Sequence, residues 1–154
     1  MTNKILSIEL IGIFIASLTA CSSDDHTAEP PSQASKYKVE ISHEGNTEAF
    51  TQMLNVSLGV NEGQKVEISS DFQFDGAGTY PTPQLYQLVY TGAVQNITFE
   101  TVSPVNEIAV MHMFSTQSNE TLNTTIKIYK NGSLVKQQTN TMTKDNWQYN
   151  LSVR

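Results

Sequence analysis

Apolar and polar residues alternate at every second position through most of the chain from residue 36 onward. Tyr37, Val39 and Ile41 are separated by Lys38, Glu40 and Ser42, which predicts a strand with one buried face. Residues 49–58 fit either a helical turn or a strand, and we favour a strand for their second half. Further strands are expected in these segments: 66–74, 85–90, 94–102, 108–114, 126–135 and 147–153.

The spacing of these segments predicts an all-β domain. Asn131-Gly132 lies between two apolar runs, which is the strongest short signal for a two-residue hairpin turn. About eight or nine short strands at intervals of roughly 8–12 residues favour an antiparallel β-sandwich over residues 36–154. We call it immunoglobulin-like only in the sense of two stacked sheets, and a small closed barrel is the alternative.

The N-terminal segment has the pattern of a signal peptide over residues 1–20. Lys4 precedes the apolar run Ile5–Ala20, which is too short to cross a bilayer, since a spanning helix needs about 20 apolar residues. Glu9 is unfavourable inside such a run. The remaining stretch Leu10–Ala20 still has the usual length of the apolar region, about 7–15 residues.

Leu18-Thr19-Ala20-Cys21 resembles the lipobox of bacterial lipoproteins. The resemblance implies that Cys21, the only cysteine of the chain, carries a thioether-linked lipid and becomes the first residue of the mature protein. Two or more acyl chains hold a protein firmly on a membrane, so the lipid on Cys21 would be a stable anchor. The alternative is an ordinary secretory signal that is cleaved near Ala20 and leaves the thiol of Cys21 free.

Residues 21–35 are polar, acidic and proline-containing, and we expect them to form a disordered tether behind the lipidated cysteine. Ser23, Asp24 and Asp25 resemble the acidic export signal of surface-exposed lipoproteins of the Bacteroidota. That resemblance implies a bacterial cell envelope protein, anchored in the outer leaflet of the outer membrane and exposed at the cell surface. A solvated acidic linker on a periplasm-facing lipoprotein is the alternative.

Composition and motifs exclude several function classes. The chain has 9 Lys and Arg against 15 Asp and Glu, a net charge of −6, and its lysines are scattered, which argues against nucleic acid as a partner. His43-Glu44 begins like a zinc-protease motif, but Thr47 stands at the position of the second histidine. Asp71 and Asp75 resemble the start of a calcium loop that lacks its bidentate glutamate. We therefore expect no catalytic residue, no metal and no cofactor.

Two predicted strands are apolar on both faces and suggest a binding surface. In residues 108–114, His112 lies on the side of Val110 and Phe114 and is expected in the core, whereas Met111 and Met113 lie on the other side. Tyr86 and Tyr90 repeat the pattern on another strand. The candidate binding patch is therefore Tyr86, Tyr90, Met111 and Met113, for a protein, lipid or glycan partner. The alternative is cover by the loop around Pro81 and Pro83.

The remaining aromatic pair, Trp147 and Tyr149, forms with Leu151 and Val153 an apolar pattern at every second position. This pattern favours a core position over a sugar-binding platform. The segment Ile126–Val135 resembles a hairpin common in small single-sandwich lipoproteins of the same bacterial group, most of which have no assigned activity. We expect a lipid-anchored, non-enzymatic binding or accessory module. A structural subunit of a cell-envelope complex is the second possibility, and an enzyme is the third.

Overall fold

A computed structural model describes residues 33–79 and 85–154 of the chain. The predicted signal peptide, the lipidation site Cys21 and the acidic motif 23–25 lie outside the described residues. So do Pro81 and Pro83, the predicted cover of the two-sided strands.

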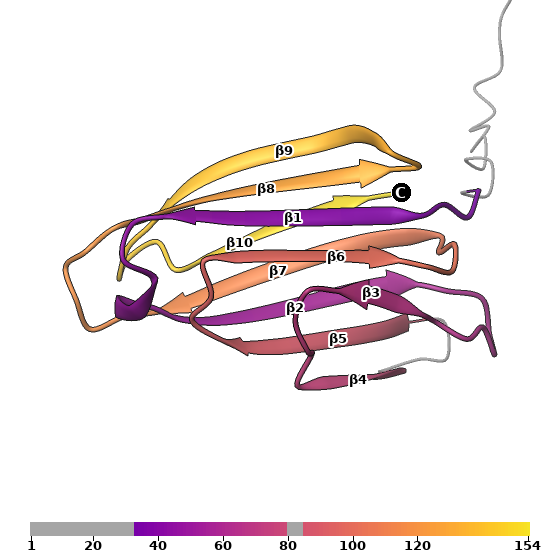
Figure 1. The fold of residues 1–154 in the computed structure, drawn as a ribbon, viewed down its shortest axis with the longest axis horizontal. Helices are drawn as coiled ribbons and strands as arrows, with labels where there is room; N and C mark the ends of the chain where they lie inside the picture. Colours follow the sequence, from indigo (N-terminus) through magenta and orange to yellow (C-terminus); the bar gives the residue numbers. More distant parts are fainter. Residues whose placement is uncertain (1–32, 80–84) are drawn as a thin grey trace, which may run out of the picture.

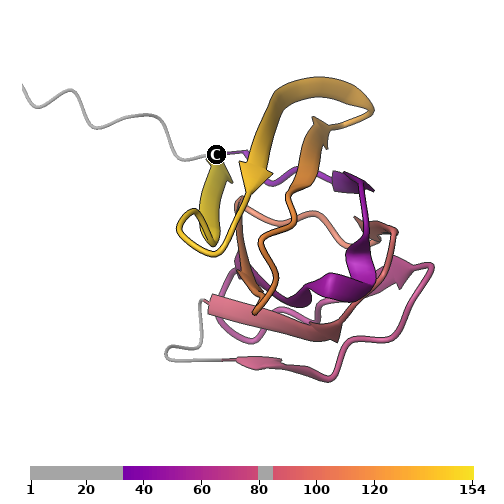
Figure 2. The same cartoon turned by 90° about the vertical axis from the view of Figure 1, so that its left-hand side faces the viewer.

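Within the described residues, ten strands form two antiparallel sheets of five strands each, stacked face to face (Figures 1 and 2). This confirms the predicted β-sandwich. Sheet A contains, in spatial order, β3 (Ile68–Ser70), β6 (Asn96–Thr101), β1 (Tyr37–Glu44), β8 (Leu122–Lys130) and β9 (Ser133–Met142). Sheet B contains β10 (Gln148–Val153), β7 (Glu107–Ser115), β2 (Thr51–Gly59), β5 (Leu85–Gly92) and β4 (Gly76–Thr79).

The core fills the space between the sheets and uses every second residue of each long strand. Ile41 of β1 lies beside Ile126 of β8 in sheet A, and Val56 of β2 lies beside Val110 of β7 in sheet B. All four are buried. Burying such side chains is the main favourable contribution to folding, because it removes apolar surface from water. Among the described residues, no helix is both long and apolar enough to cross a bilayer.

Two segments differ from the predicted strands. The apolar alternation in residues 66–74 produces only the short strand β3, after which the chain bends. Phe72 and Phe74 nevertheless stay at the core, because their rings contact each other (4.7 Å between centroids), Tyr90 (5.0 Å from Phe72) and Phe99 (5.7 Å from Phe74). The turn-rich residues 76–79, for which no strand was expected, form β4 on the edge of sheet B.

The segment 49–58 is a strand from Thr51 onward, and the alternative of a helical turn at Phe50, Met53 and Leu54 is wrong. A single 3-10 turn, η1 (Thr47–Ala49), precedes β2. Asn46 caps this turn, since its side-chain oxygen accepts a hydrogen bond of 3.2 Å from the backbone N–H of Glu48. The preference for a strand in the second half is therefore confirmed.

The Asn131-Gly132 turn joins β8 and β9, as predicted, and both residues have positive φ angles, 51° and 82°. A Cβ added at Gly132 would meet nothing within 4 Å, so the backbone conformation alone decides the effect of a substitution. We expect Gly132→Ala to lower the free energy of unfolding by about 1 kcal/mol. Urea unfolding followed by circular dichroism measures this loss. Ser133→Ala is the control, and an unchanged midpoint for Gly132→Ala would contradict the turn geometry.

Candidate functional site

The outer face of sheet A is charged, and its charges largely neutralise one another. Lys38 and Glu40 form an ion pair of 2.7 Å, and the hydroxyl of Tyr129 donates to the other carboxylate oxygen of Glu40 at 2.9 Å. These two hydrogen bonds keep the pKa of the Glu40 carboxyl below its ordinary value. Lys127 lies beside Glu40 in the register of β8 with β1. This face therefore resembles an ordinary solvated surface.

The outer face of sheet B carries no charge over three successive rungs of side chains. Its residues point outward because their neighbours along each strand, such as Leu54 and Val56 on β2, point into the core. We call this surface the neutral face. From β5 across β2 and β7 to β10, its rungs are Gln87-Ser57-Ala109-Ser152, Val89-Asn55-Met111-Asn150 and Thr91-Met53-Met113-Gln148.

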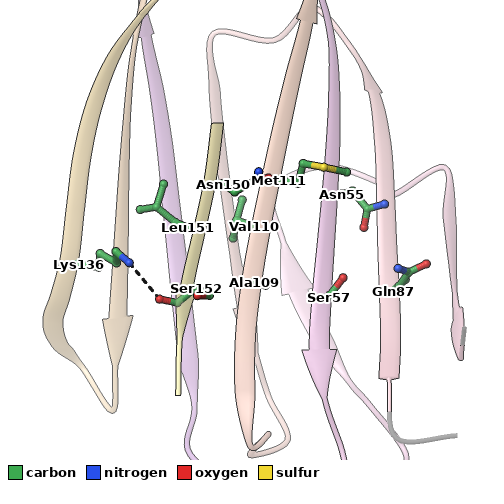
Figure 3. Close-up of a pocket in the computed structure, with 10 residues that line it drawn as sticks. All are labelled: Asn55, Ser57, Gln87, Ala109, Val110, Met111, Lys136, Asn150, Leu151 and Ser152. Carbon is green, nitrogen blue, oxygen red and sulfur yellow. Dashed lines mark hydrogen bonds between the residues drawn. The ribbon is translucent and has the colours of Figure 1, made fainter. Parts of the chain in front are cut away.

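The neutral face contains a hollow with a cavity volume of about 340 Å³ (Figure 3). Ala109, on β7 between Ser57 and Ser152, is short, so the middle of this rung lacks bulk. Lys136 reaches the rim from β9 of sheet A, where its Nζ donates to the backbone oxygen of Ser152 at 3.2 Å. The lining consists of Asn55, Ser57, Gln87, Ala109, Val110, Met111, Lys136, Asn150, Leu151 and Ser152.

The chemistry of the hollow suits an uncharged polar ligand. Asn55, Gln87 and Asn150 each offer an amide that both donates and accepts hydrogen bonds. The Oδ1 atom of Asn55 is shielded from water and accepts no hydrogen bond in the structure. An unpaired buried acceptor raises the free energy of the empty site, and a ligand O–H or N–H would satisfy it. Met111 adds an adaptable apolar contact beside these amides.

The four residues of the predicted binding patch do not share one surface. Met111 and Met113 lie half-buried on the neutral face. Tyr86 and Tyr90 lie on the opposite side of sheet B, where they pair with the core residues Leu58 and Leu54. Tyr90 is only 9% exposed, and its burial, aided by the nearby Asp75, raises the pKa of its hydroxyl. The prediction is therefore wrong for Tyr86 and Tyr90, because both lie on the face of β5 that points into the core.

The core prediction for the C-terminal aromatic pair holds for one residue. Tyr149 is buried, at 7% exposure, and faces the core from β10. Trp147 is 47% exposed, because it precedes the first residue of β10 and lies beyond the last rung that the strands cover. Trp147 is therefore a surface residue, and its predicted core position is wrong.

Two buried histidines face each other across the sandwich. His112 lies in the core as expected, and its Nδ1 is 2.9 Å from the hydroxyl of Tyr149. His43 comes from sheet A, with its Nδ1 2.9 Å from Thr124 Oγ1, and the imidazole centroids are 5.5 Å apart. Burial lowers the pKa of His43 to about 4 and that of His112 to about 3, so both are neutral at pH 7. Sequence spacing had not indicated that the two rings meet.

The two aspartates of the calcium-like segment serve the backbone in the structure. Asp71 Oδ1 accepts a hydrogen bond of 3.0 Å from the N–H of Thr98, and Asp75 Oδ2 accepts one from the N–H of Thr91. Over residues 33–79 and 85–154, no three His, Cys, Asp or Glu side chains come together in a way that could hold a metal ion.

No protein-family model matches the chain, and no curated protein matches its sequence. Its fold is similar to a domain of unknown function, DUF4425, from Bacteroides vulgatus, with a TM-score of 0.58 and 17% identity over 79% of this chain and 97% of that one. A DUF4425 protein from Bacteroides ovatus gives a TM-score of 0.54 and 15% identity, with 79% and 95% covered. A protein from Parabacteroides distasonis, solved in a calcium-bound form, gives 0.55 and 20% identity, with 86% and 100% covered.

Proposed function

We propose that this protein is a lipid-anchored outer-membrane lipoprotein that presents one β-sandwich at the cell surface as a non-enzymatic binding or accessory module. The observation that carries the binding role is the contrast between the two outer faces. Charged side chains pair with one another on sheet A, whereas sheet B presents amides, hydroxyls and methionines around a hollow. The lipobox-like residues 18–21 support the lipid anchor. The neighbours in fold from Bacteroides and Parabacteroides support the bacterial group.

The neutral face favours a glycan or an uncharged stretch of a protein partner. Both ligand classes carry many hydrogen-bond donors and acceptors without net charge, as do Asn55, Gln87 and Asn150. The lining of the hollow has Lys136 as its titratable side chain, which leaves no acid–base pair for a hydrolytic reaction. If the protein is instead a structural subunit of an envelope complex, the same face is the one to be covered by a partner.

Met111→Asp tests the binding role of the neutral face. We expect the variant to lose at least about tenfold in affinity, since the carboxylate would replace the adaptable apolar contact of Met111 with a charge that is costly to remove from water. Binding is measured on glycan arrays and by cross-linking in intact cells, each with Ca²⁺ and with a chelator, because one neighbour in fold was solved with calcium. Gln137→Asp is the matched control, because position 137 lies on the outer face of sheet A beside Lys127. Equal binding by both variants would refute the assignment of this face.

Protease shaving of intact cells, with mass spectrometry of the N-terminal peptide, tests the anchor and its location together. We expect a lipid-modified Cys21 at the N-terminus and release of domain peptides from intact cells. An unmodified Cys21 would refute the anchor. Protection of the domain until the outer membrane is opened would refute surface exposure and favour the periplasm-facing alternative.

A further inference from the structure

Positive charge gathers at the end of the sandwich where the described chain begins. The chain has 9 Lys and Arg, of which Lys4 lies outside the described residues. Besides Lys65, which lies at this end in the loop after β2 and pairs with Glu67 at 3.4 Å, five of the other eight are here, at the right-hand end in Figure 1. They are Lys36 just before β1, Lys38 at its start, Lys130 at the β8–β9 turn, Lys136 on β9 and Arg154 after β10.

Hydrogen bonds join the chain entry to the β8–β9 turn at this end. The backbone N–H of Lys36 donates to Asn131 Oδ1 at 3.0 Å, and the N–H of Asn131 donates back to the oxygen of Lys36 at 2.9 Å. Lys130 Nζ donates to the backbone oxygen of Arg154 at 3.0 Å. The start of β1, the turn and residue 154 therefore form one surface.

Three of these five cations have no acidic partner among the described residues. Lys38 pairs with Glu40, and Arg154 pairs with Glu107 at 2.9 Å. Lys36, Lys130 and Lys136 make no such ion pair within the described residues. Beside them, Leu134 and Val135 are 50% and 46% exposed. We call Lys36, Lys130, Leu134, Val135 and Lys136 the basic tip.

The opposite end of the sandwich carries acidic groups. β1 finishes there at Glu44, and η1 carries Glu48. Glu120 precedes β8, and Asp145 lies between β9 and β10 beside Lys144. Glu62, Glu67 and Glu107 lie at the basic end as well, so what distinguishes that end is the group of three lysines without an acidic partner in the described part of the chain, beside exposed aliphatic side chains.

From these observations we propose that the basic tip docks on the anionic phosphate groups of the membrane that holds the anchor. This inference rests on the proposed lipidation of Cys21. The chain from Cys21 to Ser35 reaches at most about 50 Å when fully extended, and it enters the domain at the basic tip. Unpaired lysines beside exposed aliphatic side chains are the composition that binds anionic membrane interfaces, the lysines to phosphates and the aliphatic groups to the acyl boundary.

A fluorescent label on the tip tests the docking in the full lipidated chain, purified from membranes and reconstituted into vesicles. Leu134→Cys supplies the labelling site, and its thiol is the only free one because the sulfur of Cys21 carries lipid. The label is nitrobenzoxadiazole, whose emission rises in an apolar environment. Vesicles are made of phosphatidylcholine alone or with phosphatidylglycerol. We expect at least a twofold rise in emission with phosphatidylglycerol, and loss of that rise in 1 M salt, where the screening length is about 3 Å.

A triple variant of the tip and a double variant away from it separate the effect of the basic tip from that of net charge. Lys36→Gln, Lys130→Gln and Lys136→Gln together should abolish the rise, because each lysine near an anionic surface contributes about fivefold to binding, and the three about 100-fold. Lys127→Gln and Lys144→Gln together remove two charges away from this end and should leave the rise unchanged. A label placed through Glu120→Cys, at the opposite end, should stay in water.

Flotation of the same vesicles distinguishes this inference from the anchor. If the protein floats with the vesicles while the label at position 134 stays in water, the proposed anchor is retained and the docking is refuted. Protein that does not float refutes both. A rise of equal size in vesicles of phosphatidylcholine alone would show that the tip does not select anionic lipid, and would overturn the docking on anionic phosphate groups.

Discussion

Replacing Phe99 by alanine is expected to lower the free energy of unfolding by about 3–5 kcal/mol, the largest single-residue effect that we predict for this fold. Phe99 is fully buried on β6, and its ring meets that of Phe74 edge-on at 5.7 Å between centroids. Alanine would leave a cavity between β6 and the bend that follows β3. Small domains are stable by only about 5–15 kcal/mol, so this loss is a large part of the total.

Urea unfolding followed by circular dichroism measures the effect of Phe99→Ala. Phe99→Leu keeps most of the buried volume and should cost clearly less, which covers the case in which the alanine variant does not fold. Val102→Ala is the matched control, because Val102 follows β6 but is 45% exposed, and it should change stability by less than about 0.5 kcal/mol. Similar losses for Phe99→Ala and Val102→Ala would contradict the packing of β6 against the bend.

Acidification from pH 7 to pH 5 is expected to destabilise the sandwich by about 2 kcal/mol through His112 alone. Burial lowers the pKa of His112 to about 3 and that of His43 to about 4 in the folded chain, whereas an unfolded imidazole has a pKa near 6.5. Below pH 6.5 the unfolded chain therefore binds more protons than the folded chain. The stabilisation is complete above that pH and is lost as the pH falls toward the folded pKa values.

His43 adds to this loss in the same direction, since burial also holds its folded pKa, about 4, below that of an unfolded imidazole. The free energy of unfolding is measured at pH 7, 6 and 5. The double variant His43→Gln, His112→Gln should be less stable at pH 7 but should lose little further stability at pH 5. An equally steep loss of stability in the variant would show that other groups cause the acid sensitivity.

The sequence pattern was sufficient for the fold class because each long strand buries one face only. The period of two in residues 37–42 and the Asn131-Gly132 turn correspond directly to β1 and to the β8–β9 connection. The short edge strand β4 left no such pattern, because its residues are mostly exposed and include two glycines. Phe72 and Phe74 follow the period of two although no strand forms there, since aromatic rings can reach the core from a bend.

The candidate site was only half predictable, because local patterns do not say which side of a strand faces the other sheet. Met111 was assigned to the outward side correctly, since His112 and its neighbours on the other side were recognised as core. Tyr86 and Tyr90 are large apolar residues with polar tips, and the pattern on β5 alone could not orient them. Asn55 and Ala109 were missed for a different reason. The hollow depends on the register between β2, β7 and β10, which joins residues far apart in the chain.

The position of β1 in sheet A determines how the domain would resist a mechanical pull on its N-terminal segment. β1 is held on both sides, by β6 and by β8, in two antiparallel ladders whose hydrogen bonds run perpendicular to the strand. A force applied at Lys36 along β1 would strain both ladders in shear, so that many hydrogen bonds share it at once. An edge strand would instead be peeled away one bond at a time. A pull on the N-terminal segment would therefore act first on one of the most extensively bonded strands of the sandwich.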